Sequence, residues 1–252
     1  TRDAGPVSMQ LGGSSLDTWV LTQGPVDTFS MLPSSVRVDD LVQRQRPVAS
    51  RTGENLFWMG RYTERAELQL RLVRALLDLR SSDDDVLPAP MQAMSELAKL
   101  NGLVPADVPS LTKAPRVFER AVLEALGDAR AEQGAYSLGF NLGAIERTAQ
   151  ALRDRLSPAH ARLLRQMGRE FEAVLQPPQD TPEAHSLDAK ADRAMAALDQ
   201  LAVYLAAATG AQTDRMTRDA GWRLLSVGRL IERLGAHVSM LKAFWMSNAV
   251  VH

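Results

Sequence analysis

Cysteine is absent from this 252-residue sequence. Its absence excludes disulfide bonds, a thiol nucleophile and a cysteine-ligated metal site, and it is typical of a reducing compartment. A long hydrophobic run is also lacking, because the longest one, Leu201 to Ala208, is far shorter than the roughly 20 residues of a membrane-spanning helix. No positively charged and then apolar signal segment opens the chain. We therefore expect a cytoplasmic protein that has no membrane partner.

An excess of either charge is lacking too, since 29 basic and 30 acidic residues give a net charge of −1. Such a chain has no global field to hold nucleic acid, so we expect no nucleic-acid partner. Lysine is scarce, and most cations are arginines, which suit buried or bidentate pairing with carboxylates and phosphates. The lysines are Lys99, Lys113, Lys190 and Lys242.

The sequence lacks the usual catalytic motifs. It contains no Glu-x-x-His pair, so a ferritin-like dimetal site is unsupported. His-Glu-x-x-His, Gly-x-Ser-x-Gly and a phosphate-binding loop are absent as well. The residues therefore predict no metal, no cofactor and no identifiable catalytic residue.

The first 49 residues differ in composition from the rest. Gly, Pro and Ser punctuate two short candidate strands, at 7–11 and 18–22, and residues 26–50 read as a linker. A two-stranded piece is marginal alone in water. Because the chain also begins at Thr1 rather than Met, we expect this segment to be the end of another domain in a longer protein.

From Ser50 the apolar residues follow the 3.6-residue period of a helix, interrupted by short Pro-, Gly- and Asp-containing loops. An all-α fold is expected for residues 50–252, a bundle of about seven mainly antiparallel helices after a short non-helical N-terminal segment. The expected helices span residues 50–80, 89–100, 115–133, 136–156, 158–175, 181–210 and 214–248.

The last of these helices carries apolar residues nearly all round its wheel. Such a pattern is typical of a helix that is buried on every side. We expect residues 214–248, capped by Thr213 or Asp214, to form the central helix of the bundle.

Glu-Arg dipeptides occur four times, against roughly one expected from the composition. Those at 119–120 and 146–147 read as surface pairs. The pairs Glu64-Arg65 and Glu232-Arg233 both sit in the spacing Gly-Arg-x-x-Glu-Arg, and aligning them superposes two stripes that each follow one helix face. The stripes are Glu54, Trp58, Arg61, Arg65 and Gln69 on the first helix, and Trp222, Ser226, Arg229, Arg233 and His237 on the last.

These stripes should be partly buried, and a buried guanidinium needs a carboxylate partner. Arg61 or Arg65 is therefore expected to meet Glu232, and Arg229 or Arg233 to meet Glu64. Two interpretations stay open: a structural salt-bridge network, or a pocket that offers arginine donors to a carboxylate or phosphate. The candidate ligand-binding residues are Trp58, Arg61, Glu64, Arg65, Arg229, Glu232, Arg233 and His237.

The motifs at 55–65, 152–157 and 221–233 together resemble the alpha-E family, a bacterial all-helical domain of uncharacterised function. The resemblance covers about residues 50–245 and implies a helical domain over residues 50–252. The segment 7–21 looks like the last part of a circularly permuted ATP-grasp domain, which implies that residues 1–49 are the C-terminal remnant of such a domain plus a linker. ATP-grasp enzymes form amide-type bonds through acyl phosphates.

Three functions are compatible with these observations. The first is a non-catalytic accessory module of an ATP-grasp-type peptide ligase, whose partner is that ligase and whose ligand is a peptide or another anionic small molecule. The second is an enzyme in its own right, with Glu64, Glu232 and His237 in acid–base roles. The third is a structural oligomerisation domain, which would show a large exposed apolar patch.

Overall fold

The computed structural model divides into two compact units, Thr1–Val42 and Gln43–His252, and the helical fold belongs to the second. The candidate strand at 7–11 lies outside the described residues. Of the candidate strand at 18–22, Trp19, Leu21 and Thr22 are described, and none of them forms a strand. The structure describes residues 19, 21–26, 29, 48–81, 88–128, 137–177 and 181–249.

Every regular element in the described ranges is helical, which confirms the all-α fold class. Seven α-helices and one 3₁₀ turn make up the helical unit within those ranges. Their bounds are α2 Ser50–Ser81, α3 Pro88–Leu100, α4 Pro115–Leu126, α5 Leu138–Ala151, α6 Pro158–Leu175, η2 Glu183–His185, α7 Leu187–Asp214 and α8 Ala220–Met246.

Serine caps define the start of three helices. The hydroxyl oxygens of Ser137, Ser157 and Ser186 each accept a hydrogen bond from the backbone N–H three residues later. An N-cap side chain of this kind satisfies one of the amide groups that have no carbonyl partner inside the helix. The cap at Ser186 explains why α7 begins later than the expected residue 181.

Several expected boundaries were wrong. α4 ends at Leu126 instead of 133, because Gly127 follows as its C-cap. α5 ends at Ala151 instead of 156, and the turn after it brings Arg155 to the carboxylate of Asp219.

The junction between the last two helices also differs from expectation. α7 continues through Gly210 to Asp214, and the N-cap of α8 is Asp219, not Thr213 or Asp214. The Asp219 carboxylate accepts the backbone N–H of Trp222 and pairs with Arg155. α7 is also long and apolar enough, by length and composition alone, to cross a membrane, a test that the core helix of a soluble protein passes as well. Here α7 packs against α2 and α6.

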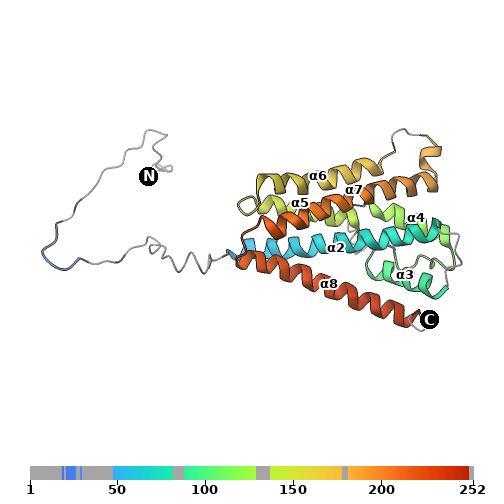
Figure 1. Ribbon diagram of the computed structural model, residues 1–252, viewed down its shortest axis with the longest axis horizontal. Coiled ribbons are helices and arrows are strands. Elements are labelled where there is room, and N and C mark those ends of the chain that lie inside the picture. The colour runs from blue at the N-terminus through green and yellow to red at the C-terminus, as the bar shows by residue number, and fades with distance from the viewer. Residues whose placement is uncertain are drawn as a thin grey trace, which may run out of the picture. The chain divides into compact units, whose positions relative to one another are not determined.

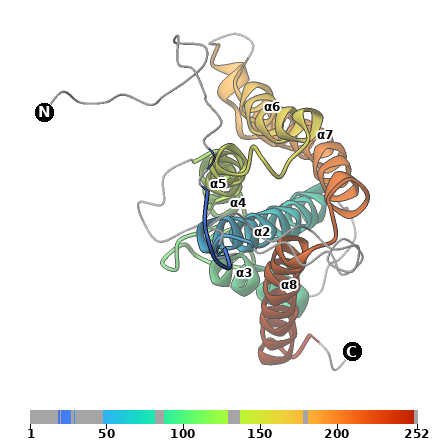
Figure 2. The same ribbon diagram turned by 90° about the vertical axis from the view of Figure 1, so that its left-hand side faces the viewer.

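α2 is the central helix of the unit. It packs against α5, α7 and α8, and Figures 1 and 2 show it running between α8 on one side and the α5, α6 and α7 group on the other. Leu56, Met59 and Val73 of α2 are fully buried. The expectation that the last helix is the most buried was therefore wrong, since α8 lies at the edge of the unit and exposes a long apolar face.

The packed helix pairs of the unit differ in relative direction. α6 and α7 are antiparallel, as the hydrogen bonds from Gln200 to Glu170 and from Arg193 to the Leu175 carbonyl show. α2 and α8 instead run parallel from the same end of the unit (Figure 1). This parallel pair is an exception to the expected antiparallel arrangement.

Two glycines allow α2 and α8 to approach backbone to backbone. A Cβ atom added to Gly60 would lie 2.1 Å from the carbonyl oxygen of Leu225, and one added to Gly228 would lie 2.2 Å from that of Phe57. Real Cβ atoms do not come this close to a carbonyl oxygen. Each helix thus supplies the glycine that makes room for the carbonyl group of the other.

Gly228→Ala should lower the free energy of unfolding by about 1–3 kcal/mol, because the helices must move apart to admit the methyl group. Alanine favours a helix over glycine by up to about 1 kcal/mol, and this gain offsets part of the loss. Gly210→Ala in α7 is the matched control, since a Cβ there meets nothing within 4 Å. Urea unfolding that finds the two variants equally stable would contradict the close crossing.

Candidate functional site

Two glutamates and four arginines join α2 to α8, and we call this set the clasp. On one side, Glu232 of α8 accepts hydrogen bonds from α2. Arg61 donates through Nε at 2.8 Å, and Arg65 donates through Nε at 2.7 Å and Nη2 at 3.0 Å. The clasp residues are Arg61, Glu64, Arg65, Arg229, Glu232 and Arg233.

The other side of the clasp repeats this arrangement with the helices exchanged. Glu64 of α2 accepts Nε of Arg229 at 3.0 Å, and it accepts Nε and Nη2 of Arg233 at 2.6 and 2.9 Å. Each Gly-Arg-x-x-Glu-Arg segment therefore gives its arginines to the glutamate of the other. The predicted reciprocal pairing across a pseudo-symmetric interface is confirmed.

Burial makes these pairs costly to break. The Glu64 side chain is only 1% exposed and that of Glu232 15% exposed. Burial alone would raise the pKa of Glu64, but hydrogen bonds from Arg233 and Arg229 outweigh it and hold this pKa below its ordinary value. The pKa of Glu232 is lowered in the same way, against burial, by Arg65 and Arg61. Both carboxylates are thus held in the ionised form.

The two sides of the clasp differ in one residue. On the Glu64 side, Glu67 adds a second carboxylate, whose Oε2 lies 3.4 Å from Nη2 of Arg229. Exchanging the helices places Gly235 at the position equivalent to Glu67. Glycine brings no carboxylate, and a Cβ added there would meet nothing within 4 Å. The Glu232 side therefore lacks both the charge and the volume of that side chain.

A pocket of about 420 Å³ opens on the Glu232 side, between α2, α3 and α8. Arg61 and Arg65 line it together with Glu232, and Lys99 at the C-terminal end of α3 adds a third cation. Three cations thus face one carboxylate, whereas on the other side Glu64 and Glu67 pair with three arginines, Arg229, Arg233 and Arg71. The surplus positive charge of the pocket on the Glu232 side favours the binding of an anion.

Not all of the expected stripe residues join the site. Trp58 stacks on Tyr62 with ring centroids 5.6 Å apart, and its ring lies 5.2 Å from the guanidinium carbon of Arg61. His237 is exposed and lines an adjoining, mostly apolar pocket of about 290 Å³, which shares Leu68, Asn101 and Ala236 with the pocket beside the clasp. Glu54 is exposed, contrary to expectation, because it lies near the start of α2.

Sequence reasoning missed Glu67, Lys99 and Gly235. Glu67 and Gly235 could have been found from the same alignment, because each lies three residues after the aligned glutamate, Glu64 or Glu232. Lys99 has no such signal, because α3 reaches the clasp only through the tertiary fold.

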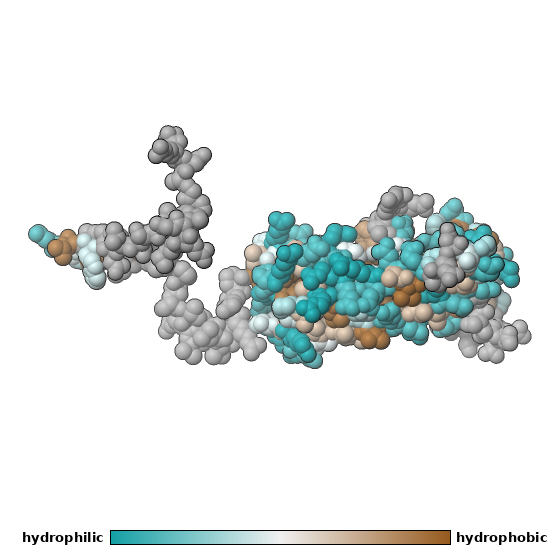
Figure 3. Space-filling view, turned by 90° about the horizontal axis from the view of Figure 1, so that it is seen from above, coloured by the Kyte–Doolittle hydropathy of each residue, from teal (hydrophilic) through white to brown (hydrophobic). Residues whose placement is uncertain are grey.

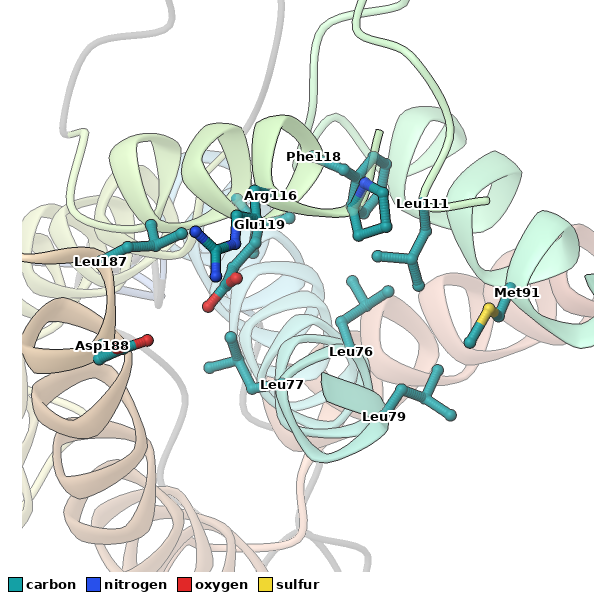
Figure 4. A pocket seen from close by; sticks show the side chains of 12 residues that line it. Leu76, Leu77, Leu79, Met91, Leu111, Arg116, Phe118, Glu119, Leu187 and Asp188 are labelled. Atoms are coloured by element: carbon teal, nitrogen blue, oxygen red, sulfur yellow. The ribbon is translucent and has the colours of Figure 1, made fainter. Parts of the chain in front are cut away.

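A second pocket, of about 570 Å³, lies between α2, α3, α4 and the start of α7 (Figure 4). Leucines of α2 and Phe118 form much of its wall, and Arg116, Glu119 and Asp188 gather at one end. Glu119 is buried. The interpretation of Glu119-Arg120 as a plain surface pair was therefore wrong for the glutamate. Within the described residues, no three His, Asp or Glu side chains are grouped closely enough to hold a metal ion.

Glu64→Ala should lower the free energy of unfolding by about 3–5 kcal/mol, because it removes a buried carboxylate and leaves the Arg229 guanidinium, 14% exposed, without that partner, while Arg233 is 45% exposed. Glu232→Ala should cost less, since Glu232 is more exposed. Asp199→Ala is the control: the Asp199–Arg74 pair is on the surface, with side chains 61% and 38% exposed, and should contribute under about 1 kcal/mol. Equal losses for Glu64→Ala and Asp199→Ala would show that the clasp is ordinary surface charge.

The lowered pKa values of Glu64 and Glu232 also predict a pH dependence. A carboxylate whose pKa is lower in the folded than in the unfolded state stabilises the fold above its unfolded pKa, ordinarily near 4.5. That contribution is lost as the pH falls through the folded pKa. The free energy of unfolding should thus decline below about pH 5, and less steeply for Glu64→Gln. Chemical unfolding at a series of pH values tests this, and parallel curves for the two proteins would contradict it.

Comparison with known proteins identifies the family. The model of the Alpha-E family, described as a predicted alpha-helical domain with a conserved ER motif, matches residues 48–251. The uncharacterized proteins Rv2567 of Mycobacterium tuberculosis (strain H37Rv) and Mb2597 of Mycobacterium bovis are each 30% identical over 190 residues, 71% of this chain and 20% of theirs. The chain thus corresponds to about a fifth of the length of these relatives, and no solved structure matches it. The match over residues 48–251, within which both ER dipeptides of the clasp lie, shows that this chain belongs to the Alpha-E family.

Proposed function

We propose that this domain is a non-catalytic accessory module of an ATP-grasp-type amide ligase, and that it holds an anionic group of the ligase substrate. The observation that carries the proposal is the pocket with three cations and one carboxylate beside the clasp. A carboxylate of a peptide or of another small acid is the ligand class that this charge pattern favours. The cytoplasm, where ATP is available, is the proposed location.

The clasp arginines can bind a ligand in the pocket while their ion pairs with Glu232 stay intact. Arg61 reaches Glu232 through Nε, and a guanidinium has five N–H donors, so Glu232 uses only part of the capacity of Arg61. The same ion pairs hold the guanidinium groups in place before a ligand arrives. A fixed donor set loses little conformational entropy on binding, which favours affinity.

The link to a ligase rests on two supports. The segment 7–21 looks like the end of a circularly permuted ATP-grasp domain, and the chain spans only a fifth of its mycobacterial relatives, so this domain is one part of larger proteins there. ATP-grasp enzymes activate carboxylates as acyl phosphates. A neighbouring module that binds a carboxylate-bearing substrate would raise its concentration near such an active site.

A stand-alone enzyme is less well supported. Glu64 and Glu232 have lowered pKa values and are held ionised by arginines, whereas a general acid or base works best with a pKa near the working pH. His237 lines the adjoining apolar pocket and does not line the pocket that Glu232 lines. The three residues therefore do not form an acid–base set.

Anion binding should raise the melting temperature. At ten times Kd a ligand adds about 1.4 kcal/mol, which corresponds to a few degrees for a domain of this size. Inorganic phosphate and glutarate, each compared with chloride at equal ionic strength, are the probes. Lys99→Met should reduce the shift and leave the melting temperature without ligand unchanged.

Lys113→Met is the matched control, because Lys113 is exposed and does not line this pocket. It should keep the full shift. If neither anion stabilises the protein beyond chloride, or if both lysine variants lose the shift equally, the pocket is not an anion site and the clasp is purely structural.

A further inference from the structure

α8 has a second face, which points away from the rest of the unit. Glu232 and Gly228 lie on the face that meets α2, while a row of exposed apolar side chains follows the exposed side of the helix, with Ile231 at its border, where it also lines the pocket beside the clasp. By contrast, the face over α6 and α7 is largely hydrophilic, with scattered apolar residues (Figure 3). We call the row the α8 seam: Val227, Ile231, Leu234, Val238, Leu241 and Trp245.

The spacing of the seam is specific. Successive members are four, three, four, three and four residues apart, which is the heptad repeat of a coiled coil. Leu230, Met240 and Met246 of α8 are exposed as well but lie off this repeat, so the seam is part of a broader apolar face. Knobs-into-holes packing against another helix needs such a repeat, because both helices must have the same period.

We propose that the α8 seam pairs with the α8 seam of a second copy of this chain, as a parallel two-stranded coiled coil. In heptad terms Ile231, Val238 and Trp245 occupy a positions, and Val227, Leu234 and Leu241 occupy d positions, so the two central heptads carry β-branched residues at a and leucine at d. β-Branched residues at a with leucine at d favour a parallel dimer. A second copy supplies an identical seam, and the two-fold symmetry closes the assembly.

The size and position of the seam fit this partner. The six side chains are 45–72% exposed, which amounts to roughly 700 Å² of surface, close to the about 800 Å² that each partner gives to a stable interface. Since the seam follows the exposed side of α8, the rest of each copy would sit on the outer side of the paired helices. The seam and the anion pocket share Ile231 at their border, but the pairing is argued from apolar spacing and the pocket from charge, so each proposal can fail without the other.

Single cysteines test the pairing directly, because the chain has none of its own. In a parallel pair, equal a positions face each other within the distance that a disulfide spans. Ile231→Cys and Val238→Cys should therefore both cross-link into dimers on mild oxidation. Val203→Cys, on α7 and also exposed, at 71%, is the control and should stay largely monomeric.

Sedimentation equilibrium provides the second measurement. The unaltered chain should be a dimer at micromolar concentration, Leu234→Glu a folded monomer, and Val203→Glu a dimer. A chain that stays monomeric would overturn the proposal, including the case in which it binds lipid vesicles or an ATP-grasp domain through this face instead. Cross-linking at one a position only would overturn the parallel orientation, because an antiparallel pair brings at most one such position together.

Discussion

The reciprocal pairing of buried carboxylates with guanidinium groups between α2 and α8 is the interaction on which the rest of the structure depends. Taking these charges out of water costs several kcal/mol per ion, and only well-placed partners compensate for that cost. Glu64, at 1% exposure, has such partners in Arg229 and Arg233 of the other helix. A shift of one helix along the other would leave a buried carboxylate or guanidinium group without its partner. The clasp therefore fixes both the register and the parallel direction of the two helices.

The pseudo-symmetry of the clasp, and the place where it breaks, connect fold to function. Gly60 and Gly228 bring the backbones into contact in equivalent ways, so that the short reach from each arginine to the opposite glutamate becomes possible. The equivalence ends where Glu67 corresponds to Gly235. On one side Glu67 supplies a second carboxylate, while the other side is open and more positive, with Lys99 added from α3. Anion binding on that side would thus use groups that stability already requires.

Much of this could be predicted from the sequence, for identifiable reasons. Helix periodicity and the repeated spacing around Glu64 and Glu232 were enough for the fold class and for the partners in the clasp. Helix ends were less predictable, because local caps such as Ser186 compete with periodicity. The burial of α8 was mispredicted because apolar residues all round a helix look the same whether it is central or has one face for the core and another for a partner. The contribution of Lys99 depends on tertiary packing that no local pattern encodes.

A double-mutant cycle between Arg233 and Glu64 is the most direct test of the central claim. The variants Arg233→Met and Glu64→Gln, alone and together, give the free energy by which the two side chains stabilise each other across the helix pair. Direct pairing predicts a coupling of about 2 kcal/mol, within the range found for residues that share an ion-pair network. Effects that add to within about 0.5 kcal/mol would contradict the clasp as the constraint that holds α2 and α8 together.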